Sequence, residues 1–336
     1  MSFKAFETDD FVVSADSVTA GLWTGNQPIL TTFFTSSTQV ASSNGNYYYN
    51  VYNSSSLTDI QFAITYGNLY GSGSQNYDDA VNGKSPSSTI WGQYRTLVLG
   101  DENSNFSFGG TTGSDIWVLS IERNRYKESL LPASTTLLIS GSGGVLSLTD
   151  NSTAVSTVEF TDAGRVFQLV SGSAGGTINP TNDGYSANSG SYGWFLPDIS
   201  TYILNPQALY NTIGLVPSRN SAISNTDDNN GKLYNAISGS AAKPGSFTAN
   251  SEETITSDFI FVRPRSSEFN YSENPSFISG STGEVIYDDF INNPQVYITT
   301  VGLYNDSSEL LAVAKLSKPL LKDFTKEALV RVKLDF

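Results

Sequence analysis

The sequence predicts a mainly β protein, and three observations support that prediction. None of the 336 residues is histidine or cysteine, and Ser, Thr, Asn, Gly and Tyr are abundant. Short runs of alternating apolar and polar side chains recur between polar turns. Helical periodicity is scarce. We therefore expect an antiparallel β-sandwich or meander body with an inserted loop-rich β-domain and few short helices.

The first half of the chain contains several predicted strands. Gln39–Asn53 is a tyrosine-rich run after a turn, and Asp59–Tyr66 alternates apolar and polar residues with a period of two. Gly67–Ser74 is rich in glycine and predicts a loop. Tyr94–Leu99 and Asp115–Ile121 are further strand candidates, and the stronger apolar character of Asp115–Ile121 predicts a central place in a sheet.

Two segments favour helices. Asn205–Ile213 begins with a residue that caps helices well, continues with Pro206 at the first helical position, and is followed by Gly214, which can end a helix. A second short helix is expected around Phe324–Ala328.

The distribution of Gly, Ser, Asn and Thr predicts how the chain is organised. These residues are concentrated in 140–258, which we interpret as an inserted, loop-heavy β-domain. Residues 1–139 and 259–336 would then form one discontinuous β body. No repeat of fixed period is present.

The last segment of the chain predicts a β-meander. Val296–Tyr304 is a strand, Asn305–Ser308 is a turn because Asn and Asp tolerate turn dihedrals, and Glu309–Lys315 returns. Ala328–Leu334 is a third alternating strand.

Basic residues are concentrated in this tail on an otherwise acidic chain. Lys315, Lys318, Arg331 and Lys333 are candidate interface residues, together with the terminal Phe336. The outer edge of the last strand is expected either to be blunted by Arg331 and Lys333 or to pair with a partner subunit. The alternative for each lysine is a solvated strand face.

Composition narrows the possible functions. Without histidine and cysteine the chain cannot form a histidine-based catalytic triad, a thiol nucleophile, a cysteine or histidine zinc site or a disulfide. The net charge of −14 disfavours nucleic acid and anionic membranes as partners. We expect no signal peptide, because the start lacks a basic region followed by an apolar one. No apolar run approaches the length of a membrane span.

The remaining chemical motifs favour structural interpretations, and we expect no catalytic residue, metal or cofactor. Adjacent carboxylates such as Asp9-Asp10 could supply an acid and a base for glycoside cleavage, but neighbours in a strand point to opposite faces. Asp227–Gly231 offers oxygen ligands, yet an EF-hand needs glutamate at its twelfth position, where this chain has Ser238. No serine–lysine spacing or phosphate-binding loop stands out.

Two clusters are candidate contact sites. Tyr47 and Tyr49 belong to a tyrosine-rich stretch that predicts core or subunit interface, with sugar stacking as the alternative. Arg123, Arg125 and Lys127 would share one face if the segment stays extended, and arginine forks suit carboxylates on a neighbouring chain.

The C-terminal segment Ile298–Phe336 also carries a family resemblance. Its pattern of an apolar strand, Gly-Leu-Tyr, an acidic turn and Leu-Leu-Ala-Val-Ala resembles the meander of baseplate-associated proteins of contractile-tailed phages. Most of the chain is similar to virion structural proteins of cyanobacterial T-even-like phages (cyanophage myoviruses). The segments that carry this similarity are Gln61–Ser74, Gln93–Gly109, Asp115–Pro132, Ser191–Leu209 and Phe259–Phe277.

The resemblance implies a non-enzymatic baseplate or tail component, made in the host cytoplasm and assembled into the virion. Its partners would be other virion proteins and copies of itself, in multiples of three or six per particle. Two alternatives remain: a receptor-binding or glycan-binding tail protein that could also cleave glycans, and a neck or head-associated structural protein.

Overall fold

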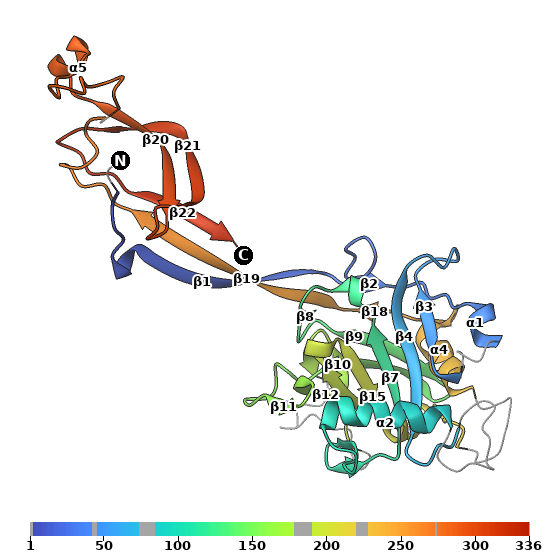
Figure 1. The fold of residues 1–336 in the computed structure, drawn as a ribbon. Coiled ribbons are helices and arrows are strands. Elements are labelled where there is room, and N and C mark those ends of the chain that lie inside the picture. The colour runs from blue at the N-terminus through green and yellow to red at the C-terminus, as the bar shows by residue number, and fades with distance from the viewer. Residues whose placement is uncertain are drawn as a thin grey trace. The chain divides into compact units, whose positions relative to one another are not determined.

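The structure is a computed structural model that describes residues 3–41, 46–73, 85–177, 190–219, 228–272 and 274–335 (Figure 1). It is mainly β and its sheets are antiparallel, as the sequence predicts. Contacts between Cα atoms divide the chain into two units. Unit 1 comprises Met1–Ser17 and Thr254–Phe336, and unit 2 comprises Val18–Glu253.

These boundaries differ from the expected insertion of 140–258. Strands β9 (Thr136–Gly141) and β10 (Gly144–Asp150) belong to the same sheet as β4 (Ile60–Asn68) and β7 (Asp115–Ile121). The Gly- and Ser-rich segments at 140–144 and 171–176 therefore belong to strands of one sheet and the turns between them, whereas residues 178–189 and 220–227 lie outside the described residues. Unit 1 contains both ends of the chain, but far fewer N-terminal residues than the expected discontinuous body.

The main sheet of unit 2 places β7 between β15 and β4, which agrees with its predicted central position. The other strands follow one antiparallel order on either side, with two short strands paired to β12 off that path. The order is β2 (Ile29–Leu30), β18 (Phe247–Thr248), β9, β10, β12 (Gly164–Ser173), β14 (Gly193–Leu196), β15 (Thr201–Leu204), β7, β4 and β3 (Tyr49–Tyr52), with β11 (Glu159–Thr161) and β13 (Gly176–Thr177) on β12.

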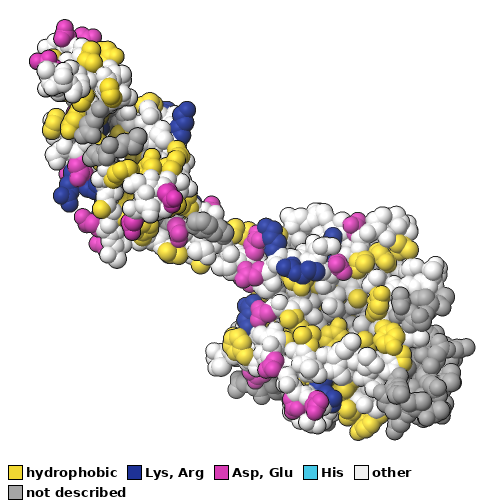
Figure 2. All heavy atoms as spheres, viewed as in Figure 1, with side chains coloured by type: hydrophobic (Ala, Val, Ile, Leu, Met, Phe, Trp, Pro, Cys, Tyr) yellow, Lys and Arg dark blue, Asp and Glu magenta, His cyan; other side chains and the backbone are white. Residues whose placement is uncertain are grey.

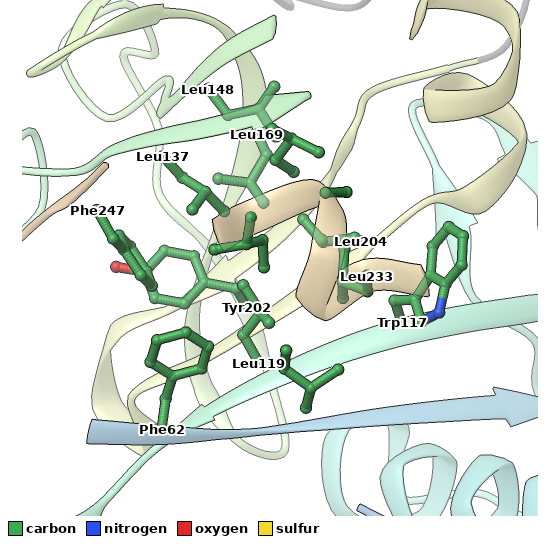
Figure 3. Packing of buried hydrophobic residues seen from close by; sticks show 14 of the residues in the cluster. Phe62, Trp117, Leu119, Leu137, Leu148, Leu169, Tyr202, Leu204, Leu233 and Phe247 are labelled. Carbon is green, nitrogen blue, oxygen red and sulfur yellow. The ribbon is translucent and has the colours of Figure 1, made fainter. Parts of the chain in front are cut away.

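Both faces of this sheet are covered, because alternate side chains of β7 enter two separate cores. Trp117 and Leu119 pack with Leu233 of helix α4 (Asn229–Ser238), as Figure 3 shows. Ile116 and Val118 face the opposite core, which contains Trp91 of helix α2 (Pro86–Leu99). Helix α4 contacts both β9 and β4, which lie far apart in the strand order, so the sheet curls around this helix.

Local capping explains the helices, and it corrects one strand prediction. Helix α3 (Pro206–Ile213) is confirmed: the Asn205 side chain accepts from the backbone N–H groups of Gln207 and Ala208, and Gly214 ends it at φ 68°. Tyr94–Leu99, predicted as a strand, is instead the end of α2, whose N-cap is Ser85. The predicted helix at Phe324–Ala328 is wrong, since these residues form a turn and irregular backbone.

Strand β4 confirms the predicted strand at Asp59–Tyr66 but continues through Gly67, which the sequence placed in a loop. A Cβ atom on Gly67 would lie 2.9 Å from the backbone N of Trp91. This glycine therefore permits α2 to pack closely on the strand. Among the described residues of the predicted Gln39–Asn53 run, only Tyr49–Tyr52 forms a strand, and the turn expected at residues 42–45 lies outside the described residues.

The remaining elements of unit 2 are short. They are helix α1 (Ser37–Ala41), the 3-10 helices η3 (Arg123–Arg125) and η5 (Pro197–Ile199), the hairpins β5 (Ser107–Phe108) with β6 (Thr111–Thr112) and β16 (Gly239–Ser240) with β17 (Lys243–Pro244), and β8 (Ser129–Leu130), which pairs with β19.

Unit 1 contains two packed β layers. One layer has β19 (Asn250–Val262) between β1 (Phe11–Gly21) and β22 (Val330–Asp335). Strands β1 and β19 continue into unit 2. The other layer is the hairpin of β20 (Val296–Tyr304) and β21 (Leu310–Lys322). The two layers share a core that includes Ile260, Val330 and Val332 from the first and Val301 and Leu303 from the second. Short helices η1 (Thr8–Asp10) and α5 (Asp288–Asn292) complete the unit.

The predicted hairpin is confirmed, but its third strand pairs elsewhere. The backbone N–H of Asn305 donates to the Glu309 carbonyl at 3.0 Å, and Ser308 has φ 64°, so the turn lies where expected. The last strand, β22, pairs with β19 and not with β21. Alternation identified a strand here but contained no information on its neighbour.

A buried lysine, Lys322, binds the end of the β20–β21 hairpin to a neighbouring loop. The Lys322 side chain has no exposed surface, and its Nζ donates to the Ser266 carbonyl and Asn270 Oδ1 at 2.9 Å each and to the Asp323 carbonyl at 3.1 Å. These three acceptors use all three N–H groups of the ammonium. The lysine therefore holds the loop around residues 266–270 against the last residue of β21.

We expect Leu233→Ala in α4 to lower the free energy of unfolding by about 2–5 kcal/mol, because the buried leucine leaves a cavity. Urea unfolding followed by circular dichroism measures this loss. The exposed Val145→Ala is the control and should change stability by less than about 0.5 kcal/mol. Equal effects of the two substitutions would contradict the packing of α4 inside the sheet.

We expect Lys322→Met to destabilise unit 1 by about 2–4 kcal/mol, since three acceptors, among them the buried Asn270, lose their charged donor. Hydrogen exchange of the β20–β22 amides should accelerate. Lys318→Met is the matched control, because Lys318 is exposed. Unchanged exchange in the Lys322 variant would show that this contact does not hold the loop.

Candidate interaction surfaces

The predicted basic segment of unit 2 is folded into a turn and is not extended. Arg123–Arg125 form the 3-10 helix η3, so the expected common face of Arg123, Arg125 and Lys127 does not exist. Arg123 clamps its own segment: Nη2 donates to the Lys127 carbonyl at 2.7 Å, and the guanidinium lies 4.7 Å from the centre of the Tyr126 ring. Lys127 Nζ pairs with Glu253 Oε1 at 2.8 Å.

Among the contacts of the described residues, Arg125 is the only one of these three side chains that neither donates to a backbone carbonyl nor pairs with a carboxylate. Its Nη1 donates to Thr24 Oγ1, which also accepts from Gln61 Nε2 at 2.7 Å. Its Nε is buried without a hydrogen-bond partner. Arg125 and Lys127 line a pocket of about 350 Å³, but Glu252 and Glu253 line it too. Because the charges balance, this pocket has no clear preference for an anion.

The two candidate tyrosines lie in different environments. Tyr47 is exposed. Tyr49 is buried, and its hydroxyl donates to Asp228 Oδ2 at 2.7 Å, while Oδ1 of the same carboxylate accepts from the Gly231 backbone N–H at 2.8 Å. Asp228 therefore caps helix α4 and binds Tyr49 at once. The position of Tyr49 is structural, and it offers no surface to a partner.

The basic candidates of unit 1 are all exposed. Arg331 and Lys333 lie over the Phe259 ring at 5.4 and 5.9 Å, and Lys333 also pairs with Asp335 at 2.8 Å. Lys315 and Lys318 are exposed on β21 and have no ion pair among the described residues. Phe336 lies outside the described residues.

Exposed apolar side chains are the most distinctive surface feature of unit 1. Val13 and Leu311 are 68% and 67% exposed, values that place most of each side chain in solvent. Figure 2 shows hydrophobic side chains over the part of the unit labelled β20, β21 and β22 in Figure 1. The other large apolar side chains exposed in unit 1 are Phe3, Phe11, Val12, Phe269, Tyr271, Ile286, Tyr287, Ile291, Tyr297, Tyr304, Leu310, Val313, Phe324 and Leu329.

A groove of about 1,010 Å³ lies within this apolar surface. Its lining includes every residue of β20 from Tyr297 to Tyr304, three phenylalanines of the N-terminal segment and Phe269. Asp306 is its one carboxylate, and its one cation, Lys4, is already paired with Glu268 at 3.0 Å. The lining of the groove is therefore mixed polar and apolar, and it carries little charge.

The buried titratable cluster of unit 2 is an ion pair. Arg219 Nε and Nη2 donate to the two oxygens of Asp115 at 2.7 and 3.2 Å, and the Tyr66 hydroxyl donates to the same carboxylate at 3.0 Å. Burial raises the pKa of Tyr66 well above its ordinary value. Because both oxygens of Asp115 are engaged, the cluster joins strands to Arg219 and leaves no free base.

In the described part of the chain, no group of three or more acidic side chains is placed to hold a metal ion. None of its helices has both the length and the apolar character needed to span a membrane. From the adjacent carboxylates, Asp10 pairs with Arg263 at 3.1 Å, and Asp228 caps α4 as described, whereas Asp227 lies outside the described residues.

Comparison of the chain with protein-family models, curated proteins and solved structures found no match.

Sequence reasoning found the basic residues but missed the apolar surface of unit 1. Two segments of the sequence could have indicated this apolar surface. Phe11-Val12-Val13 is apolar without alternation, and Leu310-Leu311 breaks the period of two at the start of β21. A strand with apolar residues on both faces needs a cover on both sides.

We expect Tyr49→Phe to lower stability by about 1–3 kcal/mol near neutral pH, because Asp228 loses a hydrogen bond. Burial, and then the bond to Asp228 and its charge, raise the pKa of Tyr49. The unfolded chain loses this proton near pH 10 and the folded chain only at higher pH, so rising pH favours unfolding.

The difference in free energy of unfolding between wild type and Tyr49→Phe should therefore narrow by up to about 1.4 kcal/mol per pH unit above pH 10. Urea unfolding at neutral and alkaline pH measures it, with the exposed Tyr47→Phe as the control. A gap that stays constant with pH would contradict the assignment.

Proposed function

We propose that this chain is a non-enzymatic structural subunit that assembles through the apolar surface of unit 1. The observation that carries the proposal is the exposure of large apolar side chains, among them Val13, Tyr297 and Leu311. Soluble monomers rarely expose contiguous apolar patches beyond a few hundred Å², and larger patches usually mark interaction sites.

The setting we propose is the virion of a tailed phage, with the baseplate or tail as the place of assembly. This part of the proposal rests on the resemblance of Ile298–Phe336 and the other quoted segments to cyanophage virion proteins. Rotational symmetry there repeats each contact around an axis, so contacts of moderate strength suffice. A neck or head position would use the same apolar surface.

Glycan cleavage is less well supported than assembly, and the exposed aromatic side chains that could stack on a sugar are tyrosines such as Tyr297 and not tryptophans. All four tryptophans, Trp23, Trp91, Trp117 and Trp194, are buried. Sugar stacking needs exposed aromatic faces, and glycoside cleavage needs two carboxyl groups about 5–10 Å apart. The groove has one carboxylate, that of Asp306.

We expect the purified chain to self-associate at micromolar concentration, and the double variant Tyr297→Lys with Leu311→Lys to weaken association at least tenfold. Sedimentation velocity measures both. High salt should leave association unchanged or strengthen it, because apolar contacts are not screened. The control is Phe160→Lys in unit 2, a side chain that is 72% exposed and should not affect association.

A wild-type chain that stays monomeric in this experiment and binds or hydrolyses polysaccharide would contradict the proposal. Equal weakening by the unit 1 and unit 2 variants would contradict the assignment of the surface.

A further inference from the structure

We propose that the free edge of β20 and the groove beside it take the free edge of β21 from a second copy of this chain. The inference rests on the proposed function and deepens it by naming the two surfaces that meet. Each copy would offer both surfaces, so the hairpins would join head to tail into a ring.

The first step of the argument is the pairing of the hairpin strands. Among the described residues, β20 pairs only with β21, and β21 only with β20. Each strand therefore keeps one edge whose backbone N–H and C=O groups have no strand partner. Such an edge is a template for a further strand, unless side chains block it.

The second step concerns the groove along β20. Consecutive residues of a strand point to opposite faces, yet the groove is lined by all eight residues from Tyr297 to Tyr304. It therefore follows the edge of the strand and not one of its faces. No charged residue occurs in β20, and Phe3, Phe6 and Phe11 also line the groove, with the Phe3 ring centre 5.1 Å from that of Tyr304.

The third step identifies the occupant by the side chains of β21. Lys315, Lys318 and Pro319 occupy its second half, and lysine and proline protect strand edges from pairing. Its first half, Leu310–Ala314, has no charge and no proline. Leu311 and Val313 are largely exposed there, while Ala312 and Ala314 pack on the core of unit 1. An uncharged segment of five residues is thus open to pairing with the uncharged β20.

The fourth step is symmetry. The two edges differ, so the contact is heterologous and closes into a ring when the rotation allows. A rotation axis along the strands places β21 of one copy antiparallel to β20 of the next, as within the hairpin. This arrangement continues one antiparallel sheet from copy to copy.

The side-chain area alone predicts a weak contact, which backbone pairing and ring closure would reinforce. Apolar side chains that are about half exposed contribute roughly 100 Å² or less each. The groove aromatics and the β21 side chains would together bury roughly 700 Å², to which the paired backbone adds, against about 1,200 Å² for small stable interfaces. Each copy in a ring makes two such contacts, and closure adds avidity. The side chains concerned are Phe3, Phe11, Phe269, Tyr297, Tyr304, Leu310, Leu311 and Val313.

Engineered cysteines test this contact directly, because the chain contains none. One variant has Thr300→Cys on β20, and two others have Leu311→Cys or Val313→Cys on β21; all three positions are exposed. Single-cysteine copies are mixed in pairs, oxidised, and separated by denaturing electrophoresis. Phe160→Cys is the control for random collisions.

We expect the mixture of Thr300→Cys with a β21 variant to form the mixed disulfide at least tenfold faster than either mixes with Phe160→Cys. A Thr300→Cys homodimer that forms faster than the mixed product would overturn the inference, because it indicates two-fold pairing of β20 with itself.

Association in sedimentation without any preferred disulfide would also overturn the inference, while leaving the proposed assembly through unit 1 in place. A wild-type chain that does not associate at all would contradict both. The two proposals can therefore fail separately.

Discussion

Burial of β7 on both faces is the constraint on which unit 2 depends. Trp117 and Leu119 enter the core around α4, and Ile116 and Val118 enter the core beside α2. Each buried side chain of this size contributes about 1.5–3 kcal/mol, so neither layer can be left open to water. A helix must therefore cover each face. The indole N–H of Trp117 donates to the Asn229 carbonyl at 2.9 Å, which ties the first turn of α4 to the same strand.

In unit 1 the apolar side chains are covered only in part. Its two layers share one core, and the inward side chains of β21 include the small residues Ala312 and Ala314. Large apolar residues such as Leu311 and Val313 lie on the outer side of the hairpin instead. The unit is thus held together by one thin core and by anchors such as Lys322, while much of its apolar surface remains in contact with water. A neighbouring chain is the simplest way to cover that surface.

Elements that depend on interactions between residues close in sequence could be predicted, whereas those that depend on residues far apart in sequence could not. Helix α3 was predictable because Asn205, Pro206 and Gly214 act within a few residues. Helix α2 was missed because its last six residues, Tyr94–Leu99, include residue types that favour strands, whereas its buried residues Trp91 and Val98 recur at helical spacing. The strand order was not predictable, since β2 pairs with β18 more than two hundred residues away.

The same distinction applies to the candidate surfaces. The charge of Arg123, Arg125 and Lys127 could be read from the chain. Their partners could not, because Thr24 and Glu253 are about a hundred residues distant. Alternation in β21 showed that the strand has two faces, but only the packed structure shows that the outer one is uncovered.

The tryptophans are confined to one of the two units, so their fluorescence is specific for that unit. All four belong to unit 2 and are buried there, and unit 1 contains none. Indole emission therefore reports the integrity of one unit alone and is insensitive to direct events at the other. Tyrosines occur in both units, so the tyrosine signal does not isolate unit 1 in the same way. Indole emission can thus separate the unfolding of unit 2 from changes at unit 1 without any attached label.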